Sequence, residues 1–184
     1  MKMMANTVRE IKNDLSERFN SLNQFLIRQS MLSAQSVAIF IDGNNVDRSL
    51  NPAGFDEGLR FINFDSFIPS ILNGRPLYKL VYLKEGTVSP RLTQRLRADY
   101  NAVIRTNKKS VDAELTLEAL SVLDRVSTIV IVSGDSDFIP LVVKAKAMGT
   151  TAEVYSVRQT TSQSLIEVCD YHSFISEKDI YVHI

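Results

Sequence analysis

The sequence predicts an α/β protein: a three-layer α/β/α sandwich around a central parallel sheet, preceded by an N-terminal helix. Short apolar runs rich in β-branched residues alternate along the chain with segments whose apolar residues recur at helical spacing. Such alternation is typical of parallel βαβ units with right-handed crossovers. The chain of 184 residues, 45% of them apolar, is also long enough to bury one full hydrophobic core.

The N-terminal part of the chain predicts a helical extension over residues 1–35, ahead of a domain at 36–184. Residues 7–33 contain no Gly or Pro, and most a/d positions of a heptad frame are apolar. Arg18 and Gln29 interrupt that frame, so the pattern leaves two alternatives open. The helix packs either on the domain or on a second copy of the chain, which would make a homodimer.

Five strands are predicted by apolar runs that end at turn residues. The runs at 37–41 and 128–132 lack alternation, which is typical of strands buried on both faces of a sheet. A further strand is expected at the sheet edge, over residues 171–175. In chain order the five main strands cover residues 37–41, 76–83, 101–105, 128–132 and 151–157.

Helices are predicted between these strands. Asn73 and Gly74 end the first of them, and Ser136 or Asp137 is the expected N-cap of the fourth. Residues 46–63, which contain one proline and two glycines, are interpreted as an irregular loop instead. The predicted helices cover residues 65–72, 90–99, 111–123, 138–148 and 162–168.

Four aspartates are predicted to gather at one edge of the sheet. Asp42 comes directly after the first strand, and Asp112 opens the helix after the third. Asp135 and Asp137 follow the fourth strand. Parallel strands end at a common edge, where ligands bind at the topological switch point. Taken singly, each acid also fits a structural role, since Asp42 shapes an Asp-Gly turn and Asp112 favours a helix N-terminus.

The chemistry of these side chains predicts a site for a hard cation. Carboxylates that converge repel one another and raise one another's pKa unless a positive charge lies between them. Oxygen ligands without Cys or a nearby His favour Mg²⁺ or Mn²⁺ over zinc. Such ions activate a water molecule and neutralise charge on a phosphodiester. The aspartates therefore point to metal-dependent hydrolysis.

Three segments of the chain resemble, in order and spacing, the signature motifs of a known family. This is the NYN family, a group of PIN-like ribonuclease domains that includes the bacterial LabA-like proteins. The resemblance spans about residues 37–175 and leaves the N-terminal helix outside. The three segments are residues 40–46 (FIDGNNV), 109–115 (KSVDAEL) and 132–140 (VSGDSDFIP).

The resemblance implies a PIN-like sheet of strand order 3-2-1-4-5 and a set of site residues. Asn45 and Ser133 match polar positions that orient the carboxylates or a phosphate. The middle motif departs at Ser110, where Gly is commoner, and Glu114 becomes a further candidate ligand. By the same match, Mg²⁺ or Mn²⁺ would be held by Asp42, Asp112, Asp135 and Asp137.

Local charge predicts a path for the substrate. The chain carries 21 basic and 21 acidic residues, so no overall excess indicates a polyanion partner. Between Lys84 and Lys109, however, seven basic residues stand against two acids, a local net charge of +5. Lys84, Arg105, Lys108 and Lys109 are expected near the aspartates and would hold the backbone of single-stranded RNA. The arginines at 91, 95 and 97 are interpreted as a solvated helix face.

Composition excludes several classes of protein. Cys169 is the only cysteine, which rules out an internal disulfide framework and a Cys-rich zinc site. No apolar run is long enough to span a membrane, and the polar N-terminus lacks the apolar segment of a signal peptide. The sequence therefore predicts a cytoplasmic protein with no membrane contact.

These observations favour a metal-dependent endoribonuclease that hydrolyses RNA phosphodiesters with an activated water and no covalent intermediate. An aspartyl-nucleophile phosphatase also places an Asp after its first strand, but it needs a second Asp two residues later, where this chain has Asn44. The remaining alternative is a non-catalytic regulatory or RNA-binding module on a PIN-like fold.

Overall fold

The computed structural model describes residues 15–23, 35–53, 58–107 and 111–183. The chain divides into two compact units, residues 1–34 and 35–184. In the first unit, residues 15–23 are helical, and the side chains of Leu15, Phe19 and Leu22 are exposed. The rest of the helix predicted over 7–33 lies outside the described residues, and its role in dimerisation stays a prediction.

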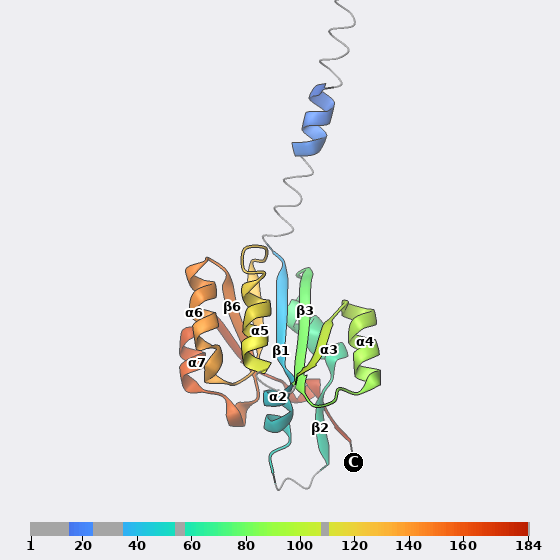
Figure 1. The fold of residues 1–184 in the computed structure, drawn as a ribbon, viewed down its shortest axis with the longest axis vertical. Coiled ribbons are helices and arrows are strands. Elements are labelled where there is room, and N and C mark those ends of the chain that lie inside the picture. The colour runs from blue at the N-terminus through green and yellow to red at the C-terminus, as the bar shows by residue number, and fades with distance from the viewer. Residues whose placement is uncertain (1–14, 24–34, 54–57, 108–110, 184) are drawn as a thin grey trace, which may run out of the picture. The chain divides into compact units, whose positions relative to one another are not determined.

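The second unit is built on a six-stranded sheet (Figure 1). Its strand order is β4-β3-β1-β5-β6-β7, and each neighbouring pair is parallel. The first five strands of this row have the predicted order 3-2-1-4-5, and the predicted edge strand extends it as β7. The strands are β1 Val37–Asp42, β3 Leu77–Glu85, β4 Val103–Asn107, β5 Thr128–Val132, β6 Thr151–Ser156 and β7 Tyr171–Phe174.

Helices cover both faces of this sheet, which confirms the three-layer sandwich. The helices are α2 Gly43–Leu50, α3 Phe64–Leu72, α4 Pro90–Tyr100, α5 Val111–Leu120, α6 Ile139–Ala147 and α7 Gln163–Val168. The side chains of β1 alternate between the two cores. Ala38 and Phe40 pack with α5, α6 and α7, whereas Ile39 and Ile41 pack with α2, α3 and α4. All six residues of β1 are buried, as its unbroken apolar run predicts.

The prediction of an irregular loop over residues 46–63 is wrong at both ends, where a helix and a strand stand instead. Helix α2 begins at Gly43 directly after β1, and Leu59–Ile62 form strand β2, which pairs antiparallel with β8, Ile180–His183. Asn51 closes the connection between α2 and β2, because its side chain donates to Arg60 O at 2.9 Å and accepts from Arg60 N at 2.7 Å. Neither element has a strong local signal, since α2 is short and polar and β2 needs a partner from the end of the chain.

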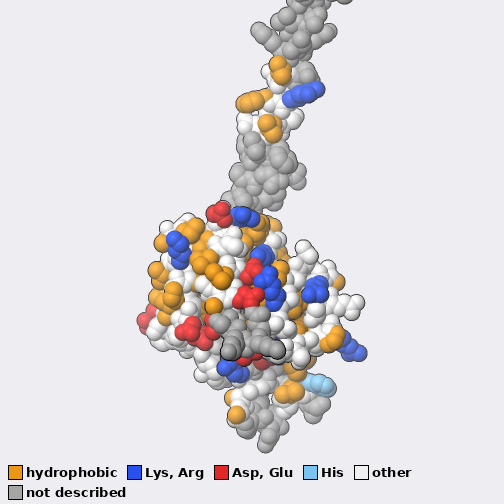
Figure 2. Space-filling view, viewed as in Figure 1, with side chains coloured by type: hydrophobic (Ala, Val, Ile, Leu, Met, Phe, Trp, Pro, Cys, Tyr) orange, Lys and Arg blue, Asp and Glu red, His pale blue; other side chains and the backbone are white. Residues whose placement is uncertain are grey.

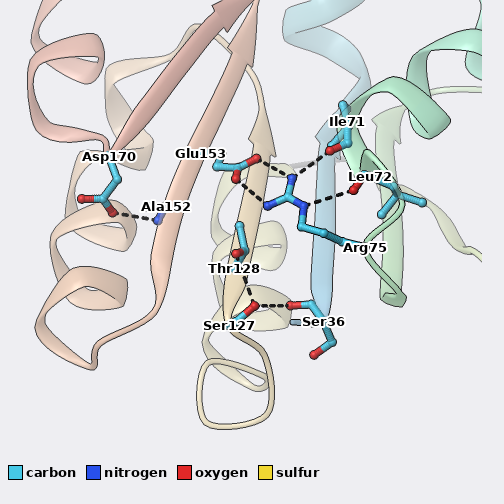
Figure 3. A network of polar contacts seen from close by, with 9 residues as sticks. All are labelled: Ser36, Ile71, Leu72, Arg75, Ser127, Thr128, Ala152, Glu153 and Asp170. Atoms are coloured by element: carbon cyan, nitrogen blue, oxygen red, sulfur yellow. Dashed lines mark hydrogen bonds and ion pairs between the residues drawn. The ribbon is translucent and has the colours of Figure 1, made fainter. Parts of the chain in front are cut away.

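The amino-terminal edge of the sheet is held by side chains that are fully paired (Figure 3). Arg75 binds both carboxylate oxygens of Glu153, at 2.6 and 3.0 Å, and donates to the carbonyls of Ile71 and Leu72 at the end of α3. Asp170 accepts from Ala152 N at 2.9 Å. This network ties α3 to β6 and β6 to the end of α7, so it fixes the sheet at the end opposite the aspartates.

Among the described helices, none has the length and apolar character needed to cross a lipid bilayer.

Candidate active site

Asp42 is the last residue of β1 and the most buried of the four aspartates, with 2% of its surface exposed. One carboxylate oxygen accepts from the backbone N–H groups of Asn44 and Asn45, at 3.1 and 3.0 Å, so Asp42 is the N-cap of α2. The other accepts from Ser133 Oγ at 3.2 Å. The pKa of Asp42 is raised to about 6, and burial is the largest cause. The charge of Asp112 raises this pKa further, whereas the three hydrogen bonds lower it.

The loops after β1 and β5 are bound to each other. Ile41 lies opposite Val132 in the parallel register, so Asp42 and Ser133 leave the sheet at the same level. Ser133 Oγ, which donates to Asp42, accepts from Asp135 N at 3.2 Å. Asn45 Oδ1 accepts from Gly134 N at 2.9 Å. Asn45 and Ser133 therefore fix the positions of the carboxylate-bearing turns.

Two glycines allow the chain segments at this edge to approach closely. A Cβ on Gly43 would lie 2.7 Å from the hydroxyl of Tyr82 and 2.9 Å from Leu83 O. A Cβ on Gly134 would lie 2.9 Å from Thr160 O. A side chain at either position would push apart the segments that carry the site.

Asp135 opens the turn that leads into α6. Its carboxylate accepts from Asp137 N at 3.0 Å and caps a 3₁₀ turn over Ser136–Phe138, from which α6 continues. The predicted N-cap at Ser136 or Asp137 is therefore wrong. The side chain of Asp135 reaches over the turn and binds the N–H of Asp137, which leaves Asp137 exposed.

The aspartates influence one another through their charges. Burial raises the pKa of Asp112, and the charges of Asp135 and Asp137 raise it further, while Arg48 lowers it. Asp112 in turn raises the pKa of Asp42. The fold thus brings all four predicted acids to one edge of the sheet, within electrostatic reach of one another.

The chemical type of these side chains suits a hard cation, because carboxylate oxygens are the ligands that Mg²⁺ and Mn²⁺ prefer. Their spacing is wider than that of a closed metal cage. In the described part of the chain, no three acidic, histidine or cysteine side chains are grouped closely enough to hold a metal ion. Asp42 is fixed by hydrogen bonds, whereas Asp112, Asp135 and Asp137 border the solvent.

An open hollow of about 400 Å³ lies beside Asp135. Its lining is almost entirely polar and combines the turn after β5 with the segment after β6. The lining residues are Asn45, Gly134, Asp135, Ser136, Gln159, Thr160, Thr161 and Ser162. Residues 159–162 were not among the site residues predicted from the sequence. Their signal was a run of polar residues directly beyond a buried strand, at the edge where ligands bind.

Comparison with known proteins supports the same architecture. The model of the NYN domain matches residues 36–177. The chain belongs to the NYN domain family. That family is a branch of the PIN-like nucleases, which typically use divalent metal ions.

A solved structure shares the fold of this NYN protein. It is the crystal structure of a protein of unknown function from Vibrio parahaemolyticus, with a TM-score of 0.67 and 21% sequence identity. The match covers 81% of this chain and 98% of the Vibrio chain. No curated protein sequence matches the chain.

Two of the basic residues predicted to line the substrate path of the NYN domain, Lys84 and Arg105, are paired with acids. Lys84 binds Asp47. Arg105 binds Glu114 at 2.8 Å and Glu118 at 2.9 Å. Acidic and basic side chains accordingly lie interleaved on this face of the molecule (Figure 2). A guanidinium held between two carboxylates offers little positive charge to a phosphate, and Glu114 is engaged away from the aspartates. Lys108 and Lys109 lie outside the described residues.

Proposed function

We propose that this NYN domain is a metal-dependent endoribonuclease that hydrolyses single-stranded RNA. The observation that carries the proposal is the uncompensated charge at the carboxyl edge, where burial and neighbouring carboxylates raise the pKa of Asp42 to about 6 and also raise that of Asp112. Acids whose pKa values are raised by burial and by a neighbouring charge, at a sheet edge, are typical of functional sites. Membership of a nuclease superfamily supports the same assignment.

In this proposal the metal ligands are Asp42, Asp112, Asp135 and Asp137, and the ion is Mg²⁺ or Mn²⁺. When bound, the ion supplies an activated water and neutralises charge on the phosphodiester. The chain's own groups position the site. Ser133 and the backbone N–H groups of α2 hold the carboxylate of Asp42, and Asn45 holds the turn after β5.

The polar hollow beside Asp135 is proposed to receive the RNA backbone near the cleaved bond. Its hydroxyl and amide groups, from Ser136, Ser162 and Gln159, are hydrogen-bond donors suited to phosphate and ribose oxygens. Lys108 and Lys109 remain in the proposal as residues that hold a phosphate, since they directly precede α5 in the sequence.

A second candidate function is a non-catalytic RNA-binding or regulatory module. The observation that favours it is the absence of any three-ligand group of acids among the described residues. Two wider expectations accompany both candidates. The protein is proposed to be cytoplasmic, and the N-terminal helix is proposed to join two copies of the chain.

Cleavage of a labelled single-stranded RNA separates the two candidates. We expect fragments with Mn²⁺ or Mg²⁺ and none with EDTA. Asp135→Asn should lower the rate by about a hundredfold or more, the scale expected when a charge-stabilising group is lost. Asp124→Asn is the matched control, because that acid is exposed in the turn before β5 and, within the described ranges, forms an ion pair with Arg125 alone, at 3.7 Å. Equal rates for Asp135→Asn and wild type would refute the nuclease site and favour the binding module.

A further inference from the structure

We infer that a second hollow, next to the aspartates, is a subsite for one nucleotide of the RNA on the side of β6 and β7. The inference rests on the proposed function for the identity of the ligand. The RNA path then lies on the side of the aspartates opposite to Lys84 and Arg105.

This subsite is a hollow of about 510 Å³ at the carboxyl edge of the sheet. Its residues come from the ends of β6 and β7, from α2 and from strands β2 and β8. The volume lies in the range of about 300–1,000 Å³ that is typical of small-ligand pockets, which is enough for one nucleotide. The polar and aromatic residues of the lining that matter here are Ser49, Arg60, Arg158, Gln159, Phe174 and Glu177.

The subsite adjoins the polar hollow beside Asp135. Gln159 lines both. Ser49, in the wall of the subsite, is hydrogen-bonded to Thr160, in the wall of the polar hollow. An RNA strand that passes the aspartates and the polar hollow therefore meets the subsite on the other side of Gln159 and Thr160.

Two arginines line the subsite, Arg60 and Arg158, and Arg158 is the exposed one. Its guanidinium carbon lies 4.1 Å from the centroid of the Phe174 ring, and the side chain is exposed. Within the described ranges no carboxylate forms an ion pair with Arg158, unlike Lys84 and Arg105 on the other side of the site. A guanidinium supported by an aromatic ring keeps its N–H donors available for a phosphate.

The same pair suits a nucleobase. RNA bases stack on aromatic rings and on arginine planes, and each stacked base contributes about 1–3 kcal/mol. The Phe174 ring is held in place by His172, whose ring lies edge-on at a centroid distance of 4.6 Å. Phe174 and Arg158 thus form a prepositioned platform whose contacts do not depend on base identity.

The test measures binding of a fluorescently labelled single-stranded RNA of about 12 nucleotides, longer than the minimum site of one binding fold. The full chain carrying Asp135→Asn serves as the parent, so that RNA is not consumed. Arg158→Ala in this background should raise Kd about five- to tenfold and lower the salt slope by about 0.7, the value for one phosphate contact on a single strand. Arg97→Ala is the matched control, since Arg97 is exposed on α4 and should leave both quantities unchanged.

Two further variants separate charge from stacking. Arg158→Lys should keep the salt slope and lose part of the affinity, and Phe174→Leu should raise Kd about fivefold while keeping the slope. Melting temperatures equal to that of the parent exclude unfolding as the cause, and Arg158→Lys serves as the substitute test if Arg158→Ala unfolds.

The outcome is independent of the nuclease assignment. If the wild type cleaves no RNA but Arg158→Ala weakens binding as expected, the subsite stands and the nuclease proposal fails. If the wild type cleaves RNA and Arg158→Ala binds like Arg97→Ala, the subsite is refuted and the nuclease proposal stands. A parent that does not bind RNA at all also refutes the subsite.

Discussion

The two edges of the central sheet carry similar side chains in opposite electrostatic states. At the amino-terminal edge, Glu153 is neutralised by Arg75, and the pKa of Asp170 is lowered, first by its hydrogen bond from Ala152 N and then by Lys146. At the carboxyl edge, burial and neighbouring acids raise the pKa values of Asp42 and Asp112. The same sheet thus stores compensated charge at one end and uncompensated charge at the other.

This difference separates residues that hold the fold from residues that act. A compensated carboxylate stabilises the protein as it stands, because its partner is part of the chain. An uncompensated cluster costs stability unless a ligand from outside supplies the missing positive charge. Removing a charge while keeping the hydrogen-bonding side chain should therefore stabilise or spare the fold at the carboxyl edge, whereas removing a charge should weaken the fold at the amino-terminal edge.

The largest expected effect is on catalysis at the carboxyl edge. Asp42→Asn keeps the size of the side chain and an acceptor for α2 but removes the charge, so cleavage of single-stranded RNA in Mn²⁺ should fall by about a hundredfold or more. Initial rates per folded molecule, with circular dichroism to verify the fold, measure this. Unchanged rates would mean that Asp42 acts only as a helix cap.

The next effect is a pH dependence of stability in EDTA. The pKa of Asp42 is raised to about 6, so between its ordinary value and pH 6 the folded state binds more protons than the unfolded state. Stability contributed by this group is present at low pH and lost as the pH rises through 6. Between pH 4 and pH 7, the stability of Asp42→Asn measured by urea unfolding should rise relative to that of the wild type by about 2 kcal/mol, before any loss from its weaker capping. A constant difference across this range would contradict the assignment of the raised pKa.

At the amino-terminal edge, Arg75→Ala should destabilise the fold by about 2 kcal/mol. It leaves the carboxylate of Glu153 without its partner, and the cost is below that of a fully buried pair because the Arg75 side chain is 29% exposed. Urea midpoints measure it, with the exposed Arg97→Ala as control. Cleavage per folded molecule should not change, and a selective loss of cleavage would show that the two edges are coupled.

The smallest expected effect distinguishes two neighbouring acids by stability alone. Asp135 caps the turn before α6, so Asp135→Ala should cost about 1 kcal/mol. Among the described residues Asp137 takes part through its backbone N–H, which alanine retains, so Asp137→Ala should cost close to nothing in metal-free buffer. Thermal melting of both variants in EDTA checks this, and a reversed order would restore Asp137 as the cap.

The sequence by itself determined the sheet and the position of the acids along it. The apolar runs of β1 and β5 end at Asp42 and shortly before Asp135, and a parallel sheet brings both ends to one edge. These features depend on local pattern and on a general rule of topology, so no knowledge of particular contacts was needed.

Tertiary structure alone decided the features that depend on distant partners. Strand β2 exists because β8, from the end of the chain, pairs with it. The basic side chains nearest the predicted RNA path are neutralised by acids from other elements, as Arg105 is by Glu114, whereas Arg158 rests on Phe174. The charge of each residue can be read from the sequence. Whether an opposite charge neutralises it depends on the distance between the two side chains, and only the folded chain sets that distance.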